Sequence, residues 1–345
     1  MGSQQALTSR AQDILHSIVK CYIETGEPVA SRTIARSRKE PLSPASIRNL
    51  MADLDDAGYL EQPHTSAGRV PTQKAFQLYV RSLLGGRLPM LPEERFRSEL
   101  YEVDSLAGRI ARSCHLLTEF THNVGIAAAI PTAAQTLDRV ELLKLADRRV
   151  LMIVITRDGT VRDRVVWIDE ELSLDELNSI CNYLNRNFSG WVLADARREL
   201  EARLREASAA YDAILSRLIE LYGKGLLDLH ASAEVHLEGA ANLVALDLRL
   251  TRQRMRELFR ALEEKKRILE LLDRFLEQPA GQLGVQVGLG EIHPSMKELA
   301  LIGVNVLLPG GLGAKIAVLG PLRMNYERVM SAVRHMGSTL ERLPC

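Results

Sequence analysis

The sequence is poor in aromatic residues and has no long hydrophobic run. Phe, Trp and Tyr make up 5% of the 345 residues. The longest apolar stretches, such as VLMIVI at 150–155, are far shorter than the roughly 20 residues that a membrane-spanning helix needs. The first residues, MGSQQALTSR, lack the apolar core of a signal peptide. We therefore expect a cytoplasmic protein that does not contact a membrane, with the short apolar runs forming buried strands.

Cysteine is scarce as well. Cys21, Cys114, Cys181 and Cys345 lie far apart, without a CxxC pair and without the Cys/His spacing of a zinc site. This pattern favours a reducing compartment and predicts no metal site. GxSxG, Walker-type and HExxH motifs are also missing from the sequence. We expect a protein that is not an enzyme and that needs no cofactor.

An excess of charge of either sign is absent too, because the formal net charge is +0. The totals therefore do not favour nucleic acid as a partner, and any such prediction depends on local charge.

Local patterns at the N-terminus predict four helices. Residues 8–25 carry apolar residues at helical spacing, and a short helix follows from Ser31. Ser43 is a typical N-cap, Pro44 suits the first helical position, and Gly58 ends this third helix. The segment TQKAFQLYVRSLL predicts the fourth helix.

Between the third and fourth helices lies the polar segment GYLEQPHTSAGRVPT, residues 58–72, which has the composition of a hairpin. Three helices, a hairpin and a closing helix are the pattern of a winged helix-turn-helix domain. Small residues at the start of the third helix allow close approach to base edges, and Arg and Asn can hydrogen-bond to bases or phosphates. The predicted DNA contacts are Arg32, Ser43, Ala45, Ser46, Arg48, Asn49, His64, Thr65, Ser66 and Arg69.

A less specific interpretation of the same residues stays open. Polar loops between helices are usually solvated connections. The basic run Arg32, Arg36, Arg38 and Lys39 fits a solvated helix face as well as a phosphate contact.

The segments LTSRAQDILHSIVKCYIETGEPVASRTIA and LSPASIRNLMADLDDAGYLEQPHTSAGRVPT closely resemble the N-terminal domain of the heat-inducible transcription repressor HrcA family. The C-terminal stretch that begins VGLGEIHPSMKELALIGVNVLLPGG resembles the last segment of that family. The sequence departs from the family pattern at Ala30, Ser46 and Leu50, where the family often has Gly, Thr and an acidic residue.

The resemblance implies a homodimeric repressor of chaperone genes that binds an inverted-repeat operator in double-stranded DNA. It also implies that a GroEL-type chaperonin supports activity, and that repression is lost on heat stress. The implied fold is α+β: a winged helix at 1–84, a linker at 85–92, a GAF-like α/β-sheet domain at 93–170 and 253–345, and a mostly helical inserted dimerisation segment at 171–252.

The remaining patterns agree with a sheet flanked by helices. Strands are expected at 124–131, within 137–168, and at 283–288, 300–308 and 313–319; helices are expected at 93–122, 173–187, 195–222, 252–277 and 325–342. The helix at 252–277 carries the charged face RQRMRELFRALEEKKR.

Two other functions fit the same sequence. One is a metabolite-sensing winged-helix regulator with a ligand pocket in the GAF-like domain. The other is a chaperonin-associated protein whose winged helix no longer binds specific DNA.

Overall fold

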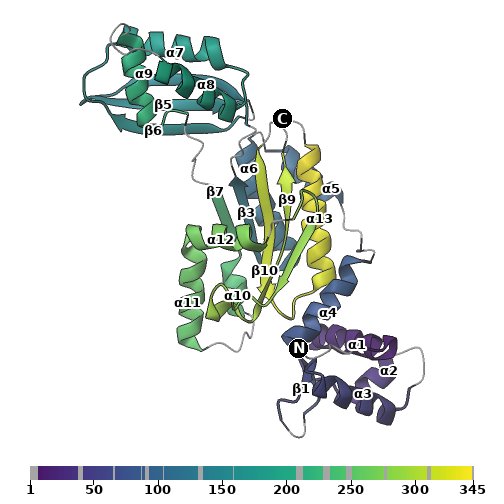
Figure 1. Cartoon of the computed structure of the whole chain (residues 1–345). Coiled ribbons are helices and arrows are strands. Elements are labelled where there is room, and N and C mark those ends of the chain that lie inside the picture. Colours follow the sequence, from purple (N-terminus) through teal and green to yellow (C-terminus); the bar gives the residue numbers. More distant parts are fainter. Residues whose placement is uncertain are drawn as a thin grey trace.

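The computed structural model shows a chain folded into three parts, arranged one after another in Figure 1. It describes residues 7–37, 42–64, 67–86, 88–89, 93–103, 105–130, 135–157, 159–206, 213–227, 234–245, 251–275, 278–308 and 312–343. No helix among these residues is both long and apolar enough to cross a membrane.

The first part contains four helices and a small hairpin: α1 (Ser9–Thr25), α2 (Ser31–Ser37), α3 (Pro44–Asp56), β1 (Leu60–Glu61), β2 (Val70–Pro71) and α4 (Gln73–Leu84). The Thr8 side chain caps α1, and Gly26 ends it with a left-handed φ of 72°. The apolar faces of α1, α3 and α4 share one core, which includes Ile14, Ile47 and Phe76. The strands β1 and β2 are antiparallel.

The central part is built on a five-stranded antiparallel sheet in the order β7-β3-β10-β9-β8. Its strands are β3 (Val124–Ile130), β7 (Glu234–Glu238), β8 (Leu283–Val287), β9 (Leu299–Leu307) and β10 (Gly313–Pro321). Helices α6 (Leu106–Thr121) and α13 (Tyr326–Arg342) pack on one face of the sheet, while α10 (Ala240–Ala245), α11 (Arg252–Glu263) and α12 (Lys265–Phe275) pack on the other.

The alternation of side chains along each strand explains these two covered faces. On β3, Ala127 belongs to the core under α6 and α13, whereas Ile126 and Ala128 belong to the core under α11 and α12. Both faces are therefore apolar, which accounts for the nearly continuous hydrophobic sequence VGIAAAI.

The third part is a separate unit with a sheet of its own. Its strands β4 (Leu137–Lys144), β5 (Arg149–Thr156) and β6 (Val161–Trp167) pair only with one another among the described residues. Helices α7 (Leu174–Phe188), α8 (Leu193–Glu206) and α9 (Ala213–Gly223) cover one face and share a core with Val140, Met152 and Val166.

This pairing corrects the expected place of the strands within 137–168, which we assigned to the central sheet. They belong to the inserted unit, and β7, expected inside the insert, pairs with β3 in the central sheet. The pairing favours an insert that begins near residue 135 and ends before residue 234, instead of the expected 171–252. The full set of domain boundaries stays a prediction.

The other face of the three-stranded sheet is mostly apolar and is not covered by any described helix. We call it the open sheet face. The strand register places three charged residues, Glu141, Arg149 and Asp163, on this face together with seven apolar ones: Leu143, Leu151, Ile153, Ile155, Val161, Val165 and Trp167. Trp167 is 62% exposed and Val161 is 60% exposed.

Two of the expected long helices are divided, and the one expected at 195–222 is seen as α8 and α9, with 207–212 outside the described residues. The helix expected at 93–122 is α5 (Glu93–Tyr101) followed by α6, because Ser105 accepts a hydrogen bond from the Gly108 amide and begins a new helix. The helix expected at 252–277 is interrupted at Glu264, whose backbone is extended (φ −78°, ψ 98°).

Helix α4 joins the first part to the central part. Phe76 and Tyr79 pack against the buried ring of Tyr326, with ring centroids 6.2 Å and 6.3 Å away. The Gln73 side-chain amide donates to the Val287 carbonyl over 2.9 Å. The Tyr79 hydroxyl lies 3.4 Å from Glu327, and burial together with this carboxylate raises the pKa of Tyr79 to about 12.

Candidate nucleic-acid interface

The start of α3 is held by its own side chains. The Ser43 hydroxyl accepts a hydrogen bond from the Ser46 amide over 3.1 Å, and the two hydroxyl oxygens lie 2.9 Å apart. Pro44 occupies the first turn, where its missing N–H costs nothing. The first turn of α3 is therefore ordered and ends in small polar groups.

Most predicted contacts on α3 lie on its exposed side. Ile47 is fully buried, and the next buried residues along α3 are Met51 and Leu54. By contrast, the surface side of this turn is formed by Ser43, Ala45, Ser46, Arg48 and Asn49, all of which are exposed. Arg48 makes no ion pair with any carboxylate of the described residues. The structure thus brings five of the predicted contacts together on one accessible surface.

Arg32 lies on α2, which packs against α3. Its neighbour Ile34 is buried and anchors the short helix, whereas Arg32 and Arg36 are exposed. Arg38 and Lys39 of the predicted basic run lie outside the described residues.

The hairpin carries the remaining predicted contacts. His64 is exposed, and its carbonyl accepts a hydrogen bond from the Ala67 amide over 2.9 Å. Thr65 and Ser66 lie outside the described residues.

Arg69 is held away from the hairpin tip. Its guanidinium pairs with Asp55 near the C-terminal end of α3 at 3.0 Å. Its backbone exchanges two hydrogen bonds of 2.9 Å with Val29. The Arg69 side chain therefore links the hairpin to α3. We did not predict this role, because the sequence does not show which cation pairs with Asp55.

Gly68 permits this backbone pairing. A Cβ atom at this position would lie 2.5 Å from the Val29 carbonyl oxygen, far inside contact distance. Any larger residue would push the hairpin away from the segment between α1 and α2.

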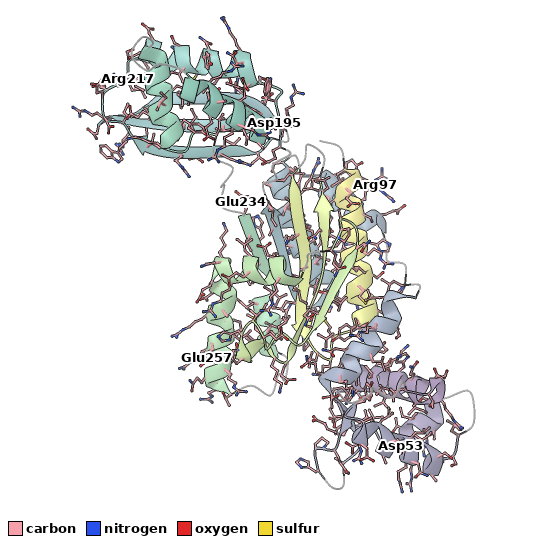
Figure 2. All side chains as sticks on the ribbon, in the orientation of Figure 1. Asp53, Arg97, Asp195, Arg217, Glu234 and Glu257 are labelled. Carbon is pink, nitrogen blue, oxygen red and sulfur yellow. The ribbon has the colours of Figure 1, made fainter. Side chains whose placement is uncertain are left out.

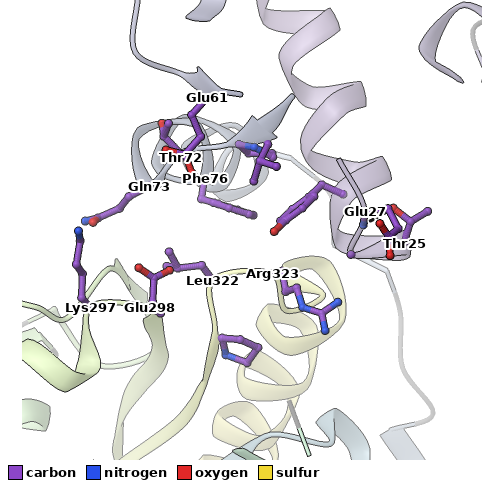
Figure 3. A pocket seen from close by; sticks show the side chains of 15 residues that line it. Thr25, Glu27, Glu61, Thr72, Gln73, Phe76, Lys297, Glu298, Leu322 and Arg323 are labelled. Carbon is purple, nitrogen blue, oxygen red and sulfur yellow. Dashed lines mark hydrogen bonds between the residues drawn. The ribbon is translucent and has the colours of Figure 1, made fainter. Parts of the chain in front are cut away.

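A cavity of about 550 Å³ opens between the first part and the central part (Figure 3). The charged residues of its lining are Glu27 and Glu61 from the first part and Lys297, Glu298 and Arg323 from the central part. The guanidinium of Arg323 lies over Gly26, so close that a Cβ there would be 2.6 Å from one of its nitrogens. The cavity thus belongs to the junction and not to the interior of the central sheet, where we expected any ligand pocket.

Within the part of the chain that the structure describes, no three His, Cys, Asp or Glu side chains gather in a way that could hold a metal ion. Burial raises the pKa of the Cys114 thiol to about 12, so it is a neutral core group at ordinary pH.

Comparison with known proteins gives consistent results at the level of family. Residues 108–330 match the model of the HrcA protein C-terminal domain. The chain is 37% identical to the heat-inducible transcription repressor HrcA of Geobacter sulfurreducens, with 98% of both chains covered. It is 34% identical to the protein of the same name from Sorangium cellulosum, with 95% of both chains covered.

A solved structure has the same fold. The crystal structure of a hypothetical protein at 2.2 Å resolution superposes with a TM-score of 0.62 and 23% sequence identity, covering 97% of this chain and 98% of the other. The match to the family model over more than half of the chain, and the identity to two repressors over nearly the whole length, show that the chain belongs to the HrcA family.

Proposed function

We propose that this protein is a homodimeric, heat-inducible repressor of chaperone genes that binds an inverted-repeat operator through a winged helix formed by its first part. The names of its relatives support the repressor function. In this proposal α3 enters the major groove, and the β1–β2 hairpin is the wing.

The observation that carries the proposal is the exposed first turn of α3. Arg48 and Asn49 have the side chains best suited to hydrogen-bond to base edges, and both are exposed next to the small residues Ala45 and Ser46. A helix can approach DNA closely only where such small side chains face it. Arg32 and His64 lie on the flanking elements and are proposed to contact phosphates.

Arg69 has a modified role in the proposal. Because it pairs with Asp55, it positions the hairpin and contributes positive charge only near the base of the wing. Thr65 and Ser66 remain proposed contacts of the wing tip.

The open sheet face supports the homodimer. It gathers seven apolar side chains on one side of a small sheet, and monomeric proteins rarely expose large contiguous apolar patches. Arg149 and Asp163 lie on the same face, so a two-fold arrangement can place opposite charges across the interface. A two-fold dimer matches an operator made of two inverted arms.

The chaperonin belongs to the proposal through the family resemblance. A GroEL-type chaperonin keeps the repressor folded, and heat diverts the chaperonin to other unfolded proteins. The repressor is then lost from DNA and chaperone genes are transcribed.

A reporter gene behind a chaperone promoter that contains the inverted repeat tests this function in cells. Expression of the wild-type protein is expected to lower reporter activity at the growth temperature, and heat shock is expected to restore it. A doubly substituted protein, Arg48→Ala with Asn49→Ala, serves as the non-repressing control. Unchanged reporter activity at normal protein levels would contradict the proposal.

The junction cavity favours a second candidate, the metabolite-sensing regulator. An occupant in contact with both Glu61 and Arg323 would bias the orientation of the DNA-binding part. A screen of small molecules by thermal shift, followed by operator binding with any hit, separates this candidate from the first.

A further inference from the structure

Helix α11 presents a stripe of arginines to solvent. Arg252, Arg256 and Arg260 follow one another at intervals of four residues and are all exposed. At a rise of 1.5 Å per residue they lie about 6 Å apart and span about 12 Å along the helix. The opposite side of α11 is buried through Leu258, Ala261 and Leu262. We call the three arginines the α11 stripe.

The neighbouring acidic side chains do not neutralise this stripe. Among the described residues, no ion pair involves any of its three arginines. The nearest acids on these helices have other partners: Glu257 accepts from Gln253, Glu264 pairs with Arg267, and Glu270 pairs with Lys266. Glu263 lies three residues beyond Arg260, at the C-terminal end of the helix.

The placement of Arg252 is unfavourable for the isolated helix, whereas Arg260 lies in the last turn, where a cation is favourable. The N-terminus of a helix carries partial positive charge, and acidic residues stabilise it there. The first turn of α11 contains no acidic residue and begins with Arg252, and Arg254 is exposed close by. Arg252 and Arg254 therefore cost α11 stability unless an external anion approaches them, which favours an anionic partner at this end of the stripe.

Helix α11 lies in the half of the central part that is nearer to the first part (Figure 1). Helix α11 contacts the short 3-10 helix η1 (Pro294–Met296). Lys297 follows η1 directly and lines the junction cavity together with Glu61 of β1 and Gln73 of α4 (Figure 3). In Figure 1 the lower end of α11 and the β1 hairpin lie at the same end of the molecule.

We propose that the α11 stripe binds phosphates of the DNA that flanks the operator arm contacted by α3. This inference rests on the proposed function. Negative charges recur every 3.4 Å along each DNA strand, so a row of cations about 12 Å long spans three to four nucleotides. Such contacts add affinity without reading sequence.

Two duplexes test the inference with the full-length protein. The short duplex ends at the inverted repeat, and the long duplex extends it by about 10 base pairs, one helical turn, on each side. The triple variant Arg252→Gln, Arg256→Gln, Arg260→Gln removes the stripe. A matched control, Arg97→Gln, Arg186→Gln, Arg334→Gln, removes the same charge from exposed positions elsewhere; Arg97 lies far from Glu257 of α11 (Figure 2).

The wild-type protein and the control are expected to bind the long duplex more tightly than the short one, and the stripe variant is expected to lose that gain. On the long duplex, the slope of log affinity against log salt concentration should become shallower by roughly 0.9 for each phosphate contact removed. A variant with Lys at all three positions should keep most of the slope, because it keeps the charge.

Equal binding of the wild-type protein to both duplexes would overturn the inference. The inference would also be overturned if the stripe variant and the control lost the same amount of affinity for the long duplex. Duplexes with scrambled arms, measured in parallel, distinguish a failure of this inference from a failure of the proposed function. If the wild-type protein shows no preference for the repeat, the proposed repressor function is contradicted. The phosphate contacts of the stripe, by contrast, should add the same affinity to repeat and scrambled DNA.

Discussion

Ser43 stabilises α3 and also lies on the surface that we propose contacts DNA. Its hydroxyl satisfies the Ser46 amide, which has no partner within the helix. The replacement Ser43→Ala should destabilise the first turn by about 1 kcal/mol. Hydrogen exchange of the α3 amides should then become about fivefold faster, because local opening is favoured by that amount. Ser43→Asn keeps an acceptor and should exchange nearly as the wild type does; equal exchange in the alanine variant would show that the cap contributes nothing.

Arg48 tests the assignment of base-reading residues. Arg48→Ala should weaken operator binding by roughly 1–3 kcal/mol if the side chain contacts a base, and preference at one operator position should relax. If it contacts a phosphate, all sequences should be bound more weakly by a similar factor. Binding to a panel of single-base operator variants separates the two, and circular dichroism checks that α3 is still folded. Wild-type affinity throughout the panel would remove Arg48 from the interface.

At the scale of elements, α4 couples the first part to the central part through Tyr79. Its pKa is raised to about 12 by burial and by Glu327, compared with an ordinary value near 10. The unfolded chain therefore releases the Tyr79 proton at a lower pH than the folded chain does. The stability from this group is complete below pH 10 and is lost as the pH rises towards 12.

We expect the free energy of unfolding to fall with pH in this window, and to fall less steeply in Tyr79→Phe. Burial also raises the pKa of Tyr326, so a part of the slope should persist in the variant. Chemical denaturation of both proteins between pH 8 and pH 11 measures the difference. Parallel curves would show that Tyr79 does not titrate differently in the folded state.

Local signals explain which elements could be predicted from the sequence. The bounds of α3 follow from Ser43 and Pro44, and those of α13 follow from a long amphipathic pattern. The strands β8, β9 and β10 are apolar runs bounded by glycine or proline. Each of these features is determined by residues within a few positions of the element itself.

Features that depend on distant partners could not be predicted in the same way. The apolar alternation of β4, β5 and β6 shows that they are strands but not which sheet they join, and so we placed them in the wrong sheet. Likewise, Arg69 has the composition of a DNA contact, but its partner Asp55 becomes its neighbour only when the hairpin folds back on α3. The arginines of α11 were visible as a charged face, and their four-residue spacing was the signal for a stripe.

At the scale of the whole molecule, the open sheet face should determine the oligomeric state. Ile153→Glu places a carboxylate on the middle strand of the open sheet face, opposite Glu141 and Asp163, where it would be buried in the proposed interface without a cation partner. The variant should shift the protein from dimer to monomer in sedimentation equilibrium, and operator affinity should fall because each arm is then bound separately. Ile219→Glu, at a partly exposed isoleucine of α9 outside this face, is the matched control. A variant that remains dimeric would move the interface elsewhere.

The central claim is that the first part of this chain recognises an inverted repeat. Fluorescence anisotropy at one fixed salt concentration tests it most directly, with a duplex carrying the repeat and one of equal length with both arms scrambled, each with and without a GroEL-type chaperonin. We predict a large preference for the intact repeat and a larger active fraction of protein when chaperonin is present. Equal, weak binding of both duplexes by protein that is shown to be folded would contradict the claim.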